Sequence, residues 1–167
     1  MTSSTEAPSD LGGLVSCYRE ANIELIESGA ILQYLLEKHD GFNTLLPKIG
    51  TMERVKYLKY LFYTSSTMDH LLMESYKELF VKETPDQNVI KSNKEQWNNF
   101  VVKELEEDLK KHKYIAGNKF TAADIMVGYS LYLANLVGWL QDSSQLVNNY
   151  WKLLNQRSYC KKALHLQ

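Results

Sequence analysis

The stretch 119–140 constrains the fold more than any other part of the chain. Thr121 is followed three residues later by Asp124. This is the spacing of a capping box, in which the threonine oxygen accepts from the backbone N–H of Asp124 and the carboxylate accepts from the N–H of Thr121. Phe120 precedes the cap and Ile125 lies four residues after Thr121, the offset of a hydrophobic staple. Both features predict that a helix begins at Thr121.

The predicted helix has no polar face. Apolar residues occupy most positions after the cap, so other elements should enclose the helix at the centre of a domain. A membrane span is the alternative, but residues 124–140 at about 1.5 Å each cover roughly 25 Å, short of the ~30 Å of a hydrocarbon core. The stretch also contains Ser130 and Asn135. A buried core helix is the better interpretation, and no membrane partner is predicted.

The whole-chain numbers are those of an ordinary globular protein. The 167 residues carry a net charge of -1 and are 44% hydrophobic and 23% charged, which suits one domain, or one domain with a fragment of another. Without a dense basic block, nucleic acid is not expected as a partner. Cys17 and Cys160 belong to no metal-binding cluster, so we expect reduced thiols, no metal site and a cytoplasmic location. Residues 1–13 lack the apolar core of a signal peptide and predict a disordered tail.

The remaining patterns predict a mainly α chain that begins with a β-hairpin. Residues 14–19 and 23–26 are short apolar or β-branched runs on either side of a turn. After the hairpin, apolar residues recur at helical spacing, and the longest such segment weakens around Ser65, where helix propensity is poor. Besides the capped central helix, the predicted helices cover residues 30–39, 51–82, 88–113, 146–155 and 159–166.

Glu27 and Ser28 form the best candidate for a binding site. Ser28 is a natural N-cap for the helix over residues 30–39, and a helix N-terminus offers unpaired N–H groups and a partial positive charge that can hold a carboxylate. Glu27, just outside the helix, could accept from an ammonium group on the same ligand. The pair fits a zwitterionic amino-acid end, although a serine here can also be only a cap.

Three segments resemble the cytosolic glutathione transferases. The junction of the last strand and third helix of their thioredoxin-like domain is similar to I-E-L-I-E-S-G-A-I-L-Q-Y-L-L-E-K. The capping motif at the sixth helix of their all-α domain is similar to Y-I-A-G-N-K-F-T-A-A-D-I, and their closing segment to N-N-Y-W-K-L-L-N-Q-R-S-Y-C-K-K-A-L. The resemblance implies an all-α bundle of the glutathione transferase C-terminal type over residues 51–167. A remnant of a thioredoxin-like domain, a β-hairpin plus helix, precedes it over residues 14–40.

The resemblance also implies a ligand and two sites. Glu27 and Ser28 fall on the positions that bind the γ-glutamyl end of glutathione, which is zwitterionic as the residues themselves require. Glutathione is therefore the implied ligand, with small electrophiles and a second copy of the chain, or a related chain, as partners. In the family, the helix after the hairpin unit lines the electrophile pocket and part of the dimer face. The residues of this sequence on that helix are Tyr57, Tyr60, Tyr63 and Thr64, which the resemblance implies as a possible electrophile pocket. Aromatic core packing is the alternative for each of them.

The sequence departs from the family at its start. A full thioredoxin-like half places two strands and two helices, about 35 to 45 residues, before this hairpin. The sequence has fewer residues than this before Glu27. We identify neither the activating Tyr, Ser or Cys near the first strand nor the cis-proline before the third strand, whose approximate place Val15 or Ser16 occupies. Two functions stay open: conjugation of glutathione to electrophiles, and a non-catalytic module for dimerisation or protein scaffolding.

Overall fold

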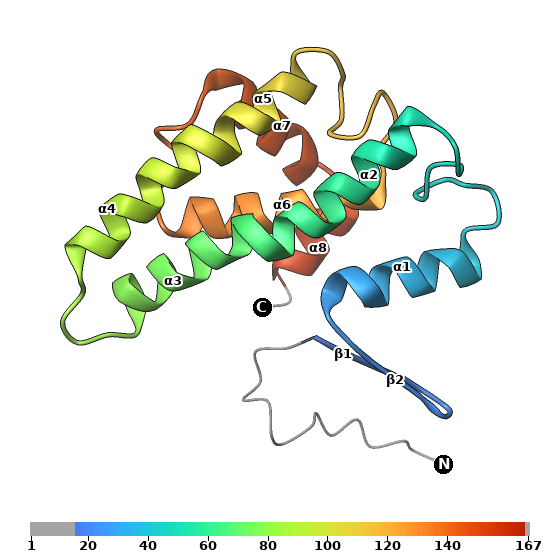
Figure 1. The fold of residues 1–167 in the computed structure, drawn as a ribbon, viewed down its shortest axis with the longest axis horizontal. Coiled ribbons are helices and arrows are strands. Elements are labelled where there is room, and N and C mark those ends of the chain that lie inside the picture. The colour runs from blue at the N-terminus through green and yellow to red at the C-terminus, as the bar shows by residue number, and fades with distance from the viewer. Residues whose placement is uncertain (1–15, 166–167) are drawn as a thin grey trace. The chain divides into compact units, whose positions relative to one another are not determined.

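The computed structural model describes residues 16–165, which fall into two compact units divided between Thr44 and Leu45. The predicted tail over residues 1–13 lies outside the described residues. Figure 1 shows the smaller unit in blue, with a hairpin and a helix, and the helices of the larger unit in colours from cyan to red. The chain is mainly α, as predicted.

The smaller unit is a β-hairpin joined to one helix. Its elements are β1 (Cys17–Glu20), β2 (Ile23–Ile26) and α1 (Ser28–His39). The strands pair antiparallel and α1 packs on both of them. The ring centroids of Tyr18 and Tyr34 lie 6.0 Å apart, and Lys38 of the helix forms an ion pair with Glu20 of the hairpin. The predicted hairpin is confirmed.

The start of α1 differs from the prediction. Ser28 is the first residue of the helix, and the N-cap position belongs to Glu27, whose side chain makes no capping hydrogen bond. Glu27 has a left-handed backbone, with φ 72° and ψ 114°, and this bend already turns the chain from β2 into the helix. The prediction of Ser28 as the N-cap was therefore wrong by one position, because the preference of serine for N-cap positions does not show where the chain bends.

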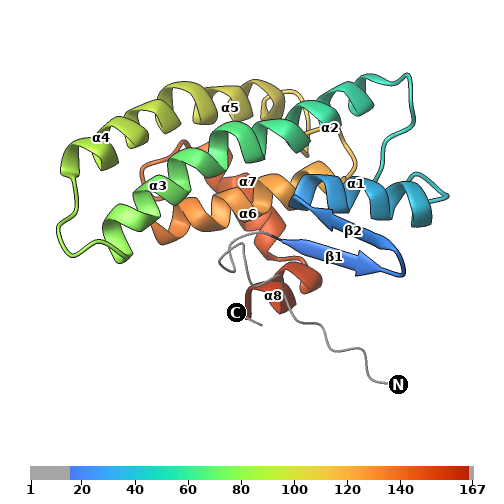
Figure 2. The same cartoon turned by 60° about the horizontal axis from the view of Figure 1, so that its bottom comes forward.

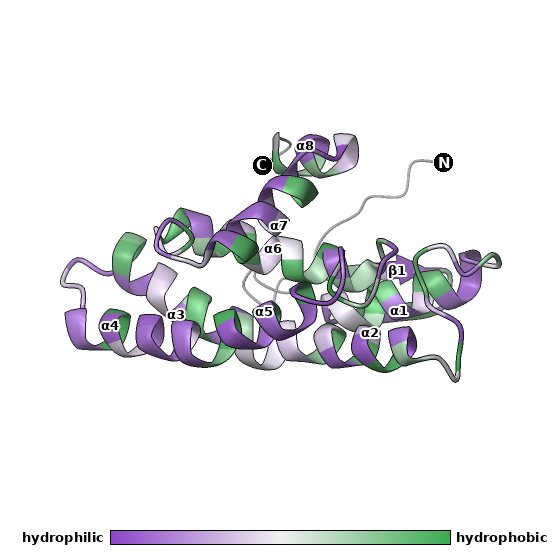
Figure 3. Cartoon of the chain, turned by 90° about the horizontal axis from the view of Figure 1, so that it is seen from above, coloured by the Kyte–Doolittle hydropathy of each residue, from purple (hydrophilic) through white to green (hydrophobic). Residues whose placement is uncertain are grey.

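The larger unit consists of two long helical arms, each made of two α-helices joined by a π-helical turn, followed by three closing helices. Its elements are α2 (Met52–Tyr63), η1 (Thr64–Met68), α3 (Asp69–Phe80), α4 (Gln87–Gln96), η2 (Trp97–Val102), α5 (Lys103–Leu109), α6 (Ala122–Leu136), α7 (Gln145–Asn155) and α8 (Ser158–His165). The predicted weak point around Ser65 coincides with η1, a π-helical turn. A second π-helical turn, η2, interrupts the other arm. In Figure 3 both arms carry hydrophilic and hydrophobic bands in alternation, as amphipathic helices do.

Helix α6 is the element around which the larger unit packs. It contacts α2, η1, α3 and α7, and Figure 2 shows it in orange alongside α2 and α3. Val127 and Leu131 on its inner face have no exposed surface. The predicted capping box is present, and the N–H of Thr121 donates to the Asp124 carboxylate over 2.7 Å. The predicted helix start is confirmed.

Two details of α6 correct the prediction. The helix ends at Leu136, and Gly138 at φ 77° turns the chain before Leu140. The side chains of Ile125, Tyr129 and Leu136 are 44%, 47% and 40% exposed, so the larger unit does not enclose the helix on every side. Neighbouring helices cover its inner faces, and Ile125 and Tyr129 line a cavity of the larger unit. Apolar composition could not distinguish a cavity wall from a core contact.

Replacing Thr121 by alanine is expected to lower the free energy of unfolding by about 1 kcal/mol, because the cap of α6 is lost. The change should be visible as a lower midpoint in urea denaturation. Ser144 caps α7 in the same manner, accepting from the N–H of Val147 over 3.3 Å, and Ser144→Ala is the matched comparison. An unchanged midpoint for Thr121→Ala would show that the capping box contributes no stability.

Candidate functional site

The bend between β2 and α1 presents open backbone donors. The first hydrogen bond of α1 joins the N–H of Ile31 to the carbonyl oxygen of Glu27 over 2.9 Å, so the N–H groups of Ser28, Gly29 and Ala30 precede the intrahelical ladder. Glu27 and Ser28 are both exposed. These donors, together with the positive end of the helix dipole, favour a carboxylate at this position.

Glu27 is strained in a way that a simple helix start does not require. Its φ of 72° and ψ of 114° lie where a residue with a side chain is rarely found. Such a conformation costs about 1 to 3 kcal/mol and persists where the surrounding structure imposes it, typically at ligand-binding positions. The bend puts Glu27 immediately before the open N–H groups of α1, so the chain offers one acidic residue and several backbone donors at the same turn.

The four residues predicted for an electrophile pocket differ in their burial. Tyr57, Tyr60 and Thr64 have no exposed surface, and the Tyr60 hydroxyl donates to Oδ2 of Asp108 over 2.8 Å. Burial, and to a smaller extent this hydrogen bond, raises the pKa of Tyr60 far above its ordinary value. Tyr63 is half-buried and lines an open hollow of about 270 Å³ between α2 and the η2–α5 arm. Tyr57, Tyr60 and Thr64 line neither this hollow nor the larger apolar cavity of the helical unit.

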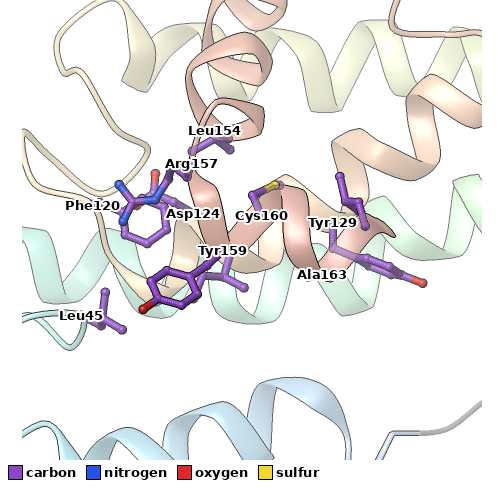
Figure 4. A pocket seen from close by; sticks show the side chains of 12 residues that line it. Leu45, Phe120, Asp124, Tyr129, Leu154, Arg157, Tyr159, Cys160 and Ala163 are labelled. Carbon is purple, nitrogen blue, oxygen red and sulfur yellow. The ribbon is translucent and has the colours of Figure 1, made fainter. Parts of the chain in front are cut away.

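A larger cavity lies elsewhere in the helical unit. It has a volume of about 500 Å³ and an almost wholly apolar lining. The lining comes from the segment before α2, from the segment before α6, from α6, and from the end of α7 with α8. Figure 4 shows its side chains converging from these elements. The lining residues are Leu45, Phe120, Asp124, Ile125, Gly128, Tyr129, Leu154, Arg157, Tyr159, Cys160, Ala163 and Leu164.

Three lining groups determine the chemistry of this cavity. The guanidinium of Arg157 lies 3.6 Å from the centroid of the Phe120 ring. Burial raises the pKa of the Cys160 thiol, which keeps it protonated and makes it a weak nucleophile. Both carboxylate oxygens of Asp124 already accept hydrogen bonds, from Ile115, Thr121 and Tyr150. Burial raises the pKa of this carboxyl group. The cavity suits binding better than catalysis.

Sequence reasoning missed this cavity although it named several of its residues. Phe120 and Ile125 were interpreted as a hydrophobic staple, and Arg157 and Cys160 lie in the closing segment that resembles the glutathione transferases. Helical periodicity identifies apolar positions but does not show that two distant helices leave space between them. Within residues 16–165, no group of three or more His, Cys, Asp or Glu side chains is placed to hold a metal ion. No helix in that range is long and apolar enough to cross a membrane.

The arrangement of a hairpin and helix followed by a bundle around a capped helix is that of the glutathione transferases. Glutathione transferase F7 from Populus trichocarpa is 22% identical with a TM-score of 0.77, over 89% of this chain and 73% of that one. The theta class enzyme from Xanthomonas axonopodis pv. citri with glutathione bound is 20% identical with a TM-score of 0.73, over 89% and 77%. Ure2p5 from Phanerochaete chrysosporium, cocrystallised with 1-(S-glutathionyl)-2,4-dinitrobenzene, is 21% identical with a TM-score of 0.75, over 86% and 69%.

The sequence itself defines the family. The family model described as glutathione S-transferase, C-terminal domain, matches residues 57–157, more than half of the chain. The chain therefore belongs to the glutathione S-transferase family. Comparison with curated proteins gives no significant match.

Proposed function

We propose that this chain binds glutathione at the start of α1, through Glu27 and the N–H groups that follow it. The observation that carries the proposal is the left-handed backbone of Glu27, a strain that an ordinary helix start does not need. The α-carboxylate of the γ-glutamyl group would accept from Ser28 and Gly29, and its ammonium group would donate to the Glu27 carboxylate. Membership of the family, and a similar structure with glutathione bound, support the same ligand.

Conjugation to electrophiles would require a group that lowers the pKa of the glutathione thiol. In the smaller unit, the Tyr18 hydroxyl donates to Glu20 over 2.8 Å. This hydrogen bond, together with burial, raises the pKa of Tyr18, opposite to the change expected of an activating tyrosine. Binding is therefore the function proposed for the described residues, and transfer is the activity that such binding would serve in a complete catalytic site.

The test separates binding from stability. Glu27→Gly should relieve backbone strain and raise the free energy of unfolding by about 1 kcal/mol, yet it should abolish glutathione binding measured by isothermal titration calorimetry, because the carboxylate is lost. Ala21→Gly is the matched control: Ala21 has φ 48° in the hairpin turn of the same unit. The control should gain stability and keep its affinity. Undiminished affinity in Glu27→Gly would overturn the proposal.

A second function, self-association through α2, is favoured by a separate observation. Val55, Leu58 and Phe62 follow helical spacing on one face of α2 and are 58%, 37% and 67% exposed. An apolar stripe left in water on a helix is typical of a protein interface. We propose that α2 pairs with α2 of a second copy, which fits the non-catalytic dimerisation module as well as an enzyme.

Phe62→Lys should convert the dimer into a monomer in sedimentation velocity, because a charge would be placed in an apolar contact. Phe80→Lys is the matched control, since Phe80 is 57% exposed at the end of α3 and lies outside the stripe. We expect this control to remain a dimer. A wild-type chain that sediments as a monomer at micromolar concentration would contradict the assignment of α2.

A further inference from the structure

The end of the chain differs in charge from the rest. All 20 acidic residues lie before residue 143, whereas four of the 19 basic residues lie after it: Lys152, Arg157, Lys161 and Lys162. The first 142 residues therefore hold 15 basic and 20 acidic residues, a net charge of -5, and the last 25 residues have a net charge of +4. Such an asymmetry is typical of a surface that meets an anionic partner.

Three of these cations belong to one pair of helices. Lys152 lies in the last turn of α7, and Lys161 and Lys162 lie on α8, which contacts α7. All three lysines are exposed. Figure 3 shows α8 standing out beyond α7 on the side of the larger unit away from α4 and α5. The lysines are therefore open to a partner.

The three lysines have no carboxylate partner among residues 16–165. Seven lysines of other segments form ion pairs in that range, and none of these pairs involves Lys152, Lys161 or Lys162. Three of the four acidic residues on α5, which contacts α7, pair with lysines of α2 or with Lys110. The acidic side chains nearest in the fold are therefore mostly engaged elsewhere.

An aromatic ring and two amides accompany the lysines. Nζ of Lys162 lies 5.6 Å from the centroid of the Tyr159 ring, and Tyr159 is 80% exposed. Asn149 and Gln156 lie three residues before and four residues after Lys152, on the same face of α7, and both are exposed. Their amide groups can donate hydrogen bonds to a carboxylate. These residues, together with Lys161, form what we call the α7–α8 surface.

Arg157 is left out of this surface, because it lines the apolar cavity together with Asp124. The apolar side of α8 belongs to the same cavity, which Cys160 and Leu164 line. The α7–α8 surface is therefore polar and basic, and the cavity takes no part in it.

We propose that the α7–α8 surface binds an acidic segment of another protein, whose carboxylates pair with the three lysines. A nucleic acid fits less well, because proteins that bind it commonly make roughly six to ten phosphate contacts. An anionic bilayer fits less well, because the apolar side of α8 is directed to the cavity and is not free for insertion. The inference goes beyond glutathione binding and self-association and depends on neither, because no residue of α1 or α2 takes part.

Fluorescence anisotropy of the full chain with a labelled peptide of repeating Glu-Gly is the test. The peptide should bind at about 0.01 M ionic strength and bind more weakly at about 0.15 M, because exposed charge pairs are screened by salt. A peptide with Gln in place of each Glu should not bind. Replacing both lysines of α8, Lys161→Gln with Lys162→Gln, should weaken binding of the Glu-Gly peptide by about fivefold through the loss of two exposed ion pairs.

Lys77→Gln with Lys91→Gln is the matched control. These lysines are exposed on α3 and α4, so this double variant has the same net charge as the first but keeps the α7–α8 surface. Its affinity for the Glu-Gly peptide should stay at the wild-type value. Equal weakening in the two double variants would show an effect of net charge alone and would overturn the proposal. Failure of the wild-type chain to bind the peptide, or tighter binding of single-stranded DNA or of phosphatidylserine vesicles, would also overturn it.

Discussion

Replacing Asp124 by asparagine is expected to lower the free energy of unfolding by about 3 kcal/mol. The Asp124 carboxylate accepts from the N–H of Ile115 at 3.0 Å and the hydroxyl of Tyr150 at 2.6 Å on Oδ1. On Oδ2 it accepts from the N–H and hydroxyl of Thr121 at 2.7 and 3.0 Å. Asparagine has one acceptor oxygen, so its NH₂ group would face two buried donors. Their lost partners, rather than the lost charge, account for the expected cost.

Chemical denaturation of Asp124→Asn and of Tyr150→Phe provides the comparison. Tyr150→Phe removes one of the four donors and leaves the carboxylate satisfied by the other three, so we expect a cost of about 1 kcal/mol. The order of the two variants is the informative result. If Tyr150→Phe were as costly as Asp124→Asn, Asp124 would not be the residue that joins the start of α6 to the connector before it and to α7.

Asp108→Asn is the substitution with the second largest expected effect, about 2 kcal/mol. The side chain of Asp108 on α5 is only 9% exposed, and its carboxylate accepts from Lys56 at 2.6 Å and Lys59 at 2.7 Å. The Tyr60 hydroxyl donates to it over 2.8 Å. Breaking a buried pair leaves its cations unpaired, but the two lysines are 20% and 37% exposed, which reduces the cost below that of a wholly buried pair. The network joins α2 to α5.

The same network predicts a dependence on pH. Burial acts to raise the pKa of Asp108, but hydrogen bonds from Lys56, Lys59 and Tyr60 outweigh it and lower the pKa from 3.8 to about 2. Because the folded-state pKa lies below the unfolded value, the contribution to stability is complete above about pH 4 and is lost as the pH falls toward 2. The stability difference between the wild-type chain and Asp108→Asn should therefore shrink across this interval.

Glu104→Gln serves as the control for both measurements. Glu104 also pairs with Lys59, at 2.6 Å, but its side chain is 44% exposed, so its removal should cost less than about 0.5 kcal/mol. A difference between the wild-type chain and Asp108→Asn that stayed constant down to pH 2 would show that the carboxylate is not stabilised as an anion in the folded chain.

Local chemistry made part of the fold predictable. The start of α6 could be read from Thr121 and Asp124 because a capping box involves residues three apart. The weak point at Ser65 was visible for the same reason, since its hydroxyl competes for backbone acceptors and donates to the carbonyl of Phe62. The η2 turn at Trp97 was not predicted, because the local propensities there give no comparable signal. The exposed face of α6 was missed because apolar composition looks the same beside a cavity and in a core.

The candidate sites show the same limit. Glu27 and Ser28 were predicted as binding residues from their motif, but the left-handed backbone of Glu27 was not predicted, since a glutamate gives no local signal for positive φ. The cavity required Leu45, Tyr129 and Cys160 to come together from three separate segments, and only tertiary packing brings such positions side by side. Tyr57 and Tyr60 were named as possible pocket residues, and their burial favours the alternative of aromatic core packing.

The proposed glutathione site rests on the left-handed bend at Glu27, which comes directly before the open N–H donors of α1. Nuclear magnetic resonance of the ¹⁵N-labelled chain during titration with glutathione addresses it directly. We expect the amide signals of Ser28, Gly29 and Ala30 to shift in a saturable manner, and the same signals to stay unmoved in Glu27→Gly. If glutathione shifted no signal at this bend in the wild-type chain, or shifted only signals of the larger unit, the proposed binding site would be wrong.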